Sequence, residues 1–247
     1  CMMYSELRKK MLIRCLHWNL RTNTACWYMI LFQIYNKFCV TDWKKDMIAI
    51  IDYDAGNLNS VQKAFQFLGE DAVITRDAAV IRSASHVVLP GVGAFADAMD
   101  NLQQYGLVEV VREAAFSGKP FLGICLGLQL LFDSSEESPG VKGLSILPGK
   151  ILRIPDAEGL KIPHMGWNSL EVKPGAKLFS GLSGEPYVYF VHSYYLAAEN
   201  EADVAATTEY STLIHASVEH DNIFACQFHP EKSGEVGLEI LRRFAAL

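Results

Sequence analysis

The segment Gly-Ile-Cys-Leu-Gly at 123–127 offers the clearest chemistry in the sequence. It sets Cys125 between two glycines, directly after the apolar run 121–124 and before the helix-like stretch 126–132. This is the pattern of a nucleophile elbow, whose tight strand-to-helix turn projects the central side chain above the sheet edge. At a helix start the backbone dipole favours the thiolate that attacks. The alternative is a small buried residue, because unpaired cysteine is among the most buried types.

A nucleophilic cysteine needs a base, and His229 has the most suggestive setting among the seven histidines. It follows the expected strand 223–227, is followed by Pro230, and precedes Glu231 by two residues. Residues two apart in an extended segment project to the same side, so the carboxylate can reach the imidazole nitrogen that does not face the thiol. Cys125, His229 and Glu231 then have the order of nucleophile, base and orienter. Taken alone, His-Pro-Glu is also a common surface turn.

A third segment, Pro-Gly-Val-Gly at 90–93, follows the apolar run 86–89. The glycines Gly91 and Gly93 on either side of Val92 allow the backbone to turn an N–H group inward. With the amide of Leu126, such a group can form an oxyanion hole. A plain turn is the alternative, and a phosphate loop is disfavoured because no Lys-Ser or Lys-Thr pair follows. Residues 47–247 contain no CxxC or HxxxH pair, so we expect no metal site and no cofactor.

The elements that must position these segments alternate between strand and helix. Apolar strands are expected at 47–51, 72–75, 86–89 and 121–124. Helices are expected at 58–68, 94–104, 107–116 and 126–132. Dense glycine and proline at 134–186 predict loops and short strands.

The remaining expected strands lie close together in the sequence, as in antiparallel hairpins, at 187–191, 194–197, 204–208, 213–218 and 223–227. A last helix is expected at 233–244. The whole pattern predicts one α/β domain: a doubly wound, mostly parallel sheet with helices on both faces and added antiparallel strands. Ligands of such sheets lie beyond the carboxyl ends of the strands, where all three segments fall.

The composition changes near Met47. Residues 1–46 carry eight Lys and Arg against three Asp and Glu, a net charge of +5, whereas residues 47–247 carry 14 against 25, a net charge of −11. The first stretch also holds four of the six cysteines and three of the four tryptophans, but no glycine or proline. We interpret residues 1–46 as an upstream or vector-derived extension and residues 47–247 as the functional domain. A targeting or membrane segment is the alternative, but the apolar run 25–32 is shorter than the roughly 20 residues a bilayer requires.

The acidic balance of the body argues against a nucleic-acid partner, because domains that bind phosphates usually carry a basic excess. No membrane association is expected either. Only Cys125 and Cys226 lie in the body, which fits a reducing compartment better than a disulfide framework. We therefore expect a cytoplasmic protein.

The segments 123–129 (Gly-Ile-Cys-Leu-Gly-Leu-Gln) and 228–231 (Phe-His-Pro-Glu) together resemble the two signature segments of the class I, triad-type glutamine amidotransferases. The likeness covers residues 47–247. Several further segments are more narrowly similar to glutaminase subunits of imidazole glycerol phosphate synthase, namely Asp-Tyr at 52–53, Gly-Asn-Leu at 56–58, Pro-Gly-Val-Gly at 90–93, Pro-His-Met-Gly-Trp-Asn at 163–168 and His-Ser-Tyr-Tyr at 192–195. Residues 1–46 match nothing in that family.

The resemblance implies that glutamine is hydrolysed to glutamate and that the ammonia passes to a separate cyclase subunit in a heterodimer. It also implies that Gln129 and the backbone of Gly93, Leu126, Ser193 and Tyr194 hold the glutamine head group and the oxyanion. For the partner interface we select Asn57, Trp167 and Lys232. The segment 163–168 is predicted to be a loop that exposes His, Met and Trp, as an interface would. The alternative for this segment is a loop anchored by a buried Trp. The alternative for Lys232 is a solvated charge at a helix start.

Three other functions remain open at this point. The chain could be an amidotransferase subunit of another pathway, serving anthranilate, guanylate or pyridoxal phosphate synthesis. It could be a stand-alone cysteine hydrolase or peptidase of the same fold. It could also be a non-catalytic binding subunit, which the presence of Cys125, His229 and Glu231 disfavours.

Overall fold

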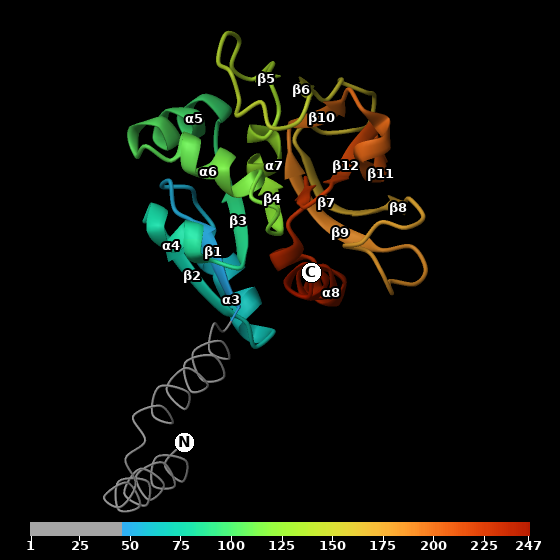
Figure 1. Cartoon of the computed structure of the whole chain (residues 1–247). Helices are drawn as coiled ribbons and strands as arrows, with labels where there is room; N and C mark the ends of the chain where they lie inside the picture. The colour runs from blue at the N-terminus through green and yellow to red at the C-terminus, as the bar shows by residue number, and fades with distance from the viewer. Residues whose placement is uncertain (1–45) are drawn as a thin grey trace, which may run out of the picture. The chain divides into compact units, whose positions relative to one another are not determined.

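Residues 46–247 are the part of the chain that the computed structural model describes (Figure 1). The interpretation of residues 1–46 as an extension concerns positions that, apart from Asp46, lie outside the described residues. Within 46–247, every helix is too short or too polar to span a lipid bilayer.

An eight-stranded sheet, ordered β2-β1-β3-β4-β13-β12-β11-β8, forms the centre of the described region. The pairings from β2 to β13 are parallel, and β12, β11 and β8 join antiparallel. The strands are β1 (Met47–Ile51), β2 (Asp71–Thr75), β3 (His86–Gly91), β4 (Phe121–Cys125), β8 (Glu171–Val172), β11 (Val204–Tyr210), β12 (Thr212–His220) and β13 (Ile223–Cys226). The expected mostly parallel sheet with added antiparallel strands is therefore confirmed.

Helices cover both faces of this sheet. One face carries α4 (Ala78–Ser83), α5 (Phe95–Gln104), α6 (Val108–Ala115) and α7 (Leu126–Leu130). The other face carries α3 (Leu58–Phe67) and α8 (Gly234–Ala245), which lie together away from α5 and α6 in Figure 1. Alternate residues of β1 enter the two cores: Ala49 and Ile51 pack on the first face, Ile48 and Ile50 on the second. A parallel strand buried on both faces explains the continuous apolar run at 47–51.

Two smaller sheets lie beside the main one. The three-stranded sheet has the order β10-β6-β5, and the second is the antiparallel pair β7-β9. These strands are β5 (Ser134–Ser135), β6 (Gly149–Arg153), β7 (His164–Ser169), β9 (Tyr187–His192) and β10 (Tyr194–Ala198). A hairpin between β9 and β10 was expected and is not formed. Ser193 alone separates these strands, and one residue is too short to reverse the chain, so β9 and β10 pair with β7 and β6 instead.

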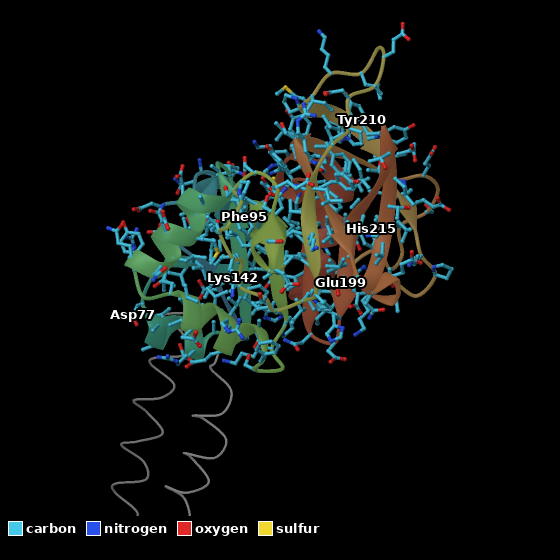
Figure 2. The ribbon with its side chains drawn as sticks, turned by 90° about the horizontal axis from the view of Figure 1, so that it is seen from above. Asp77, Phe95, Lys142, Glu199, Tyr210 and His215 are labelled. Atoms are coloured by element: carbon cyan, nitrogen blue, oxygen red, sulfur yellow. The ribbon has the colours of Figure 1, made fainter. Side chains whose placement is uncertain are left out.

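Two further differences from the expected elements have local causes. β3 does not stop at Leu89 but continues through Pro90 and Gly91. Its pairing with β1 ends at Val88, so the missing N–H of Pro90 costs no bond on that side. The short helix α4 was not expected. Its N-cap is Asp77, labelled in Figure 2, whose carboxylate accepts hydrogen bonds from two backbone N–H groups of the first turn.

Candidate active site

Cys125 ends β4 and serves as the N-cap of α7, with φ 54° and ψ −108°. Such positive φ values are sparsely populated by non-glycine residues and persist only where the surroundings enforce them. A Cβ at position 127 would lie 1.8 Å from Leu89 O, and one at position 123 would lie 2.9 Å from Gly127 O. Only glycine fits at both flanks, as an elbow requires. The structure thus places Cys125 at a sharp strand-to-helix turn at the carboxyl end of the central strand.

His229 and Glu231 lie together beyond the end of β13. His229 Nδ1 is 2.8 Å from Glu231 Oε1, and both side chains are buried. The expected extended geometry is wrong for this segment, because residues Pro230–Lys232 form a short 3₁₀ helix, η2, with His229 as its N-cap. Proline is compatible with a first helical position because its φ is already helical. The tight turn, not strand alternation, brings the carboxylate back onto the imidazole.

The electrostatic environment keeps His229 charged. Burial lowers its pKa, but the hydrogen bond to Glu231 and the charges of Cys125 and Glu231 outweigh burial and raise the pKa to about 9. Because a carboxylate only accepts, Nδ1 of the imidazole carries the proton that faces Glu231. The other nitrogen, Nε2, is buried and has no hydrogen-bond partner among the described residues, while Cys125 acts on the ring electrostatically. The structure therefore pairs His229 with Glu231, as the sequence suggested, and the roles of Cys125, His229 and Glu231 stay a prediction.

Asn57 contacts the same carboxylate from another element. It has φ 73° at the N-cap of α3, and its Nδ2 donates to Glu231 Oε1. Glu231 Oε1 thus accepts from Asn57 and His229 together, while Oε2 is buried without a hydrogen-bond partner among the described residues. The sequence suggested Asn57 only as a residue of the partner interface, which stays a prediction. Its contact with Glu231 was not anticipated.

The segment 90–93 lies beside Cys125, as expected. The β3–β4 register pairs Gly91 with Cys125, and Leu126 follows directly at the start of α7. Gly93 has φ 111°, a conformation that L side chains rarely adopt, and Val92 between the two glycines is partly exposed. The Tyr53 hydroxyl donates to Pro90 O at 2.8 Å and would lie 2.2 Å from a Cβ at position 91. Gly91 is therefore required by the close approach of Tyr53.

Gln129 lies one helical turn after Cys125, in α7, and is buried. Its Nε2 donates to Tyr194 O at 3.1 Å and to Gln227 Oε1 at 3.0 Å. Ser193 connects β9 to β10, and its carbonyl accepts a hydrogen bond from Ile154 N. The structure thus gathers Gln129 and Tyr194 in direct contact, with Ser193 adjacent in the chain.

Gln227 is a residue that sequence reasoning missed. Its side chain is fully buried, and Nε2 lies 3.6 Å from Cys125 Sγ. The β4–β13 register pairs Ile124 with Cys226, so Gln227 comes level with Cys125 one residue later. The only signal in the sequence was that Gln227 is an uncharged polar residue directly after an apolar strand. This signal does not reveal its partner, Cys125, which lies 102 residues earlier.

The segment 164–169 is a strand, β7, and not the expected loop. Strand alternation exposes Met165 and Trp167, by 63% and 55%, while His164 is 3% exposed and packs inward. The expectation of an exposed His164 is therefore wrong. Trp167 lies edge-on to Tyr189 of β9, and Lys232 of η2 is exposed. Figure 2 shows that Tyr210, whose ring stacks on His164 with centroids 3.9 Å apart, belongs to the strand-rich half of the domain.

Both cysteines of the described region, Cys125 and Cys226, are free and buried. Burial raises the pKa of the Cys226 thiol well above its ordinary value, which makes it a poor nucleophile. Residues 46–247 contain no group of three or more His, Cys, Asp or Glu side chains that could hold a metal ion.

The fold and this site define a class. The family model described as "Glutamine amidotransferase class-I" matches residues 49–246, so the chain belongs to the class I glutamine amidotransferases. Solved structures with the same fold include one described as a glutamine amidotransferase, with TM-score 0.63 and 22% identity over 81% of this chain and 99% of that one. Another, a glutamine amidotransferase from Thermotoga maritima, has TM-score 0.58 and 18% identity over 81% of this chain and 80% of that one.

Curated relatives identify one family within the class I glutamine amidotransferases. The chain is 55% identical over 201 residues to imidazole glycerol phosphate synthase subunit HisH of Moorella thermoacetica, covering 81% of this chain and 94% of that protein. It is 52% identical over 203 residues to the HisH subunit of Syntrophotalea carbinolica, covering 80% and 98%. Within the class, the chain is a member of the HisH family.

Proposed function

We propose that this chain hydrolyses glutamine at Cys125 and passes the ammonia to a cyclase subunit. Its relatives are subunits of imidazole glycerol phosphate synthase, and family membership makes the chain the glutamine amidotransferase subunit of such a synthase, acting in histidine biosynthesis. The observation that carries the proposal is the buried pair of His229 Nδ1 and Glu231 Oε1, 2.8 Å apart, together with the positive-φ turn at Cys125, whose charge acts on His229.

The first half of the reaction releases ammonia. The Cys125 thiolate attacks the side-chain amide carbon of glutamine and forms a C–S bond, which moves negative charge onto the amide oxygen. His229 donates its Nε2 proton to the amide nitrogen, the C–N bond breaks, and ammonia leaves behind a thioester. Glu231 holds the imidazole by its other nitrogen, so the ring keeps its orientation and tautomer throughout.

The second half releases glutamate. His229 takes a proton from a water molecule, whose oxygen attacks the thioester carbon. The C–S bond then breaks, glutamate departs, and the thiolate is restored. In both tetrahedral intermediates we assign the negative oxygen to the backbone N–H groups of Leu126 and of the segment Gly91–Gly93.

Gln129, Ser193 and Tyr194 are the proposed contacts for the amino acid end of glutamine. Gln129 uses its amide nitrogen within the protein. Its Oε1 has no hydrogen-bond partner among the described residues and can accept one from the α-ammonium group of glutamine. The carbonyl of Ser193 is already occupied by Ile154 N, which leaves its N–H group as the candidate contact.

The partner would bind one face of the β7–β9 pair, which we call the docking face. The register aligns Met165 with Val191 and Trp167 with Tyr189, so these four side chains project to one side, with Tyr187 beyond them. Met165, Trp167 and Tyr187 are at least half exposed, and clustered exposed apolar side chains mark interaction surfaces. Tyr189 N donates to Ser233 Oγ, and Lys232 precedes Ser233 in the chain, which supports Lys232 as a contact at the border of the docking face.

Glutaminase assays on the chain with its cyclase test the reaction. We expect Cys125→Ala to keep the fold and to retain less than about one hundredth of the wild-type kcat. His229→Ala should be comparably severe, whereas Glu231→Ala should lose less, because an orienter contributes less than the base it positions. Substantial activity in Cys125→Ala would contradict the assignment. Copurification with the cyclase tests the docking face, where Trp167→Ala should weaken binding and the exposed Phe67→Ala, on α3, should not.

A further inference from the structure

Gln227 has a place in the site that the mechanism above does not use. Its amide is buried with Nε2 facing the sulfur of Cys125 and Oε1 facing Gln129. A glutamine side chain presents a donor at one end and an acceptor at the other. Which end faces the sulfur therefore decides whether the thiolate is stabilised or opposed.

The orientation of Gln227 follows from one backbone carbonyl. Tyr194 O can only accept, so Gln129 must face it with the donor Nε2, at 3.1 Å. The same Nε2 lies 3.0 Å from Gln227, which must then present its acceptor, Oε1. This leaves the Nε2 donor of Gln227 for Cys125. Three successive contacts thus have their polarity fixed from the Tyr194 end.

The Tyr194 carbonyl is itself held from a second side. His192 Nδ1 lies 2.8 Å from it and must donate, and the remaining nitrogen of His192 lies 3.2 Å from His164 Nδ1. Burial lowers the pKa of His192 to about 3 and that of His164 to about 4, so both rings are neutral. His192 Nε2 then accepts from His164 Nδ1. His164 belongs to β7, the strand whose opposite side is the docking face.

We propose that Gln227 takes part in the reaction, because its side-chain N–H group stabilises the Cys125 sulfur as a thiolate. His192 and His164 are positioning residues, which orient Gln227 through the Tyr194 carbonyl and Gln129. This inference rests on the proposed function. Hydrogen bonds to a charged group stabilise it more than hydrogen bonds between neutral groups do. The Gln227 N–H therefore favours the thiolate over the thiol and fixes the direction of the sulfur at the strained elbow.

Other ionisable groups lie around Cys125. Glu231 pairs with His229 Nδ1 at 2.8 Å, and the charge of Cys125 acts on His229, Tyr53 and Cys226, raising the pKa of each. Burial raises the pKa of both Tyr53 and Cys226, which keeps them neutral. None of these groups changes in the variants below, so a difference between variants reports on Gln227.

The pH profile of Cys125 alkylation tests the donor role. The full chain with its cyclase is treated with iodoacetamide, and the Cys125 peptide is quantified by mass spectrometry, which separates it from the other cysteines. We compare Gln227→Met, which keeps the side-chain length but lacks an N–H, with Gln62→Met as the control. Gln62 is a half-buried glutamine of α3 that donates to Ala72 O and lies outside the site.

We expect Gln227→Met to move the alkylation midpoint up by about one pH unit, as loss of a hydrogen bond to an ion implies. At neutral pH its kcat should fall about tenfold, with KM for glutamine within about threefold, while Gln62→Met changes neither. An unchanged midpoint and a kcat within about twofold of wild type would overturn the inference. A wild-type chain without any glutaminase activity would instead refute the proposed function, and the alkylation midpoint would still decide the role of Gln227.

The positioning role is tested at His192. Asparagine can place its Nδ2 where Nδ1 of the imidazole lies and donate to Tyr194 O, whereas leucine has a similar shape and no donor. We expect His192→Leu to reproduce the raised midpoint and lowered kcat, and His192→Asn to restore most of both. Equal behaviour of the two variants, with circular dichroism showing both folded, would overturn the positioning role.

Discussion

Glu231 positions His229 through a single oxygen. Asn57 and His229 both donate to Oε1, and the carboxylate is buried with the imidazole. A buried charge that lost these donors would be costly, so each of the three side chains stabilises the placement of the others. The consequence is an imidazole that remains charged in the resting protein, ready to donate a proton to the leaving nitrogen.

The charged state of His229 predicts how stability depends on pH. Its pKa, 6.5 in the unfolded chain, is about 9 in the fold, so the folded state binds the additional proton. The stabilisation is complete below pH 6.5 and is lost as pH rises towards 9. We expect the free energy of unfolding of the wild type minus that of His229→Gln to decrease between pH 6.5 and 9, as measured by urea denaturation. A difference that grows with pH would contradict the charged resting state.

Sequence reasoning selected candidate residues whose signal is local, and it did not select Gln227, whose signal depends on distant contacts. Cys125 carries its own signal in the flanking glycines, and His229 and Glu231 stand two positions apart. Gln227 carries no such signal, because its meaning comes from Cys125 and Gln129 across the sheet. His164 was expected on the surface because the sequence around Gly166 shows no clear alternation of apolar and polar residues. The strand β7, in which His164 turns inward, was therefore not recognised.

At the scale of elements, the elbow depends on the packing of β3, β4 and α7. The first turn of α7 approaches β3 so closely that the backbone at position 127 nearly touches Leu89 O. This contact forces the chain to turn at Cys125 and explains why a residue with a side chain tolerates a positive φ there. Backbone packing therefore orients the Cys125 side chain.

Gly127→Ala tests this packing. Its Cβ would lie 1.8 Å from Leu89 O and 2.8 Å from the Leu89 carbonyl carbon, so the backbone must move. We expect destabilisation of at least about 3 kcal/mol in urea unfolding, the range of severe core substitutions. The control is Gly140→Ala, where φ is 89° and nothing lies within 4 Å; only the backbone strain of about 1 kcal/mol should appear there. Equal losses in the two variants would show that steric crowding at the elbow is unimportant.

The elements themselves were largely predictable, and the exceptions have physical reasons. α3, α5, α6 and α8 match their expected ranges within a residue or two, because each has an apolar face and a glycine or capping residue near its ends. α4 has only six residues, too few for a periodic signal, although Asp77 was available as its N-cap. The partners of β9 and β10 could not be predicted from spacing, because pairing is decided by sheets that form elsewhere in the chain.

At the scale of the whole molecule, the described residues supply every group that the proposed chemistry uses. The family match begins at residue 49, and β1 begins at Met47. We therefore expect removal of residues 1–46 to leave glutaminase activity and cyclase binding intact, measured as kcat, KM and copurification beside the full chain. An insoluble or inactive truncated chain, with an active full chain, would show that the interpretation of this segment as an extension is wrong.

The partner is expected to control the oxyanion hole. Free ammonia is lost to solvent, so a glutaminase that feeds a partner gains by completing its oxyanion hole only when that partner is bound. Gly91 and Gly93 allow the peptides around Val92 to rotate at little steric cost, and Val92 is already partly exposed at the end of β3. The docking face lies on the other side of β7 from His164, which is hydrogen-bonded to His192 in the site. A partner bound to the docking face would therefore contact the same strand, β7, whose His164 is linked through His192 to the residues around Cys125.

We therefore expect the isolated chain to hydrolyse glutamine slowly. Adding the cyclase with its nucleotide should raise kcat more than it lowers KM, because an oxyanion contact stabilises the transition state and not bound glutamine. The measurement is the glutaminase rate of the chain alone, with cyclase, and with cyclase and saturating nucleotide. Cys125→Ala in the same series provides the background rate. Equal rates in all three conditions would refute partner control while leaving the assignment of Cys125, His229 and Glu231 intact, because His229 is paired with Glu231 and Cys125 is held at its turn without any partner.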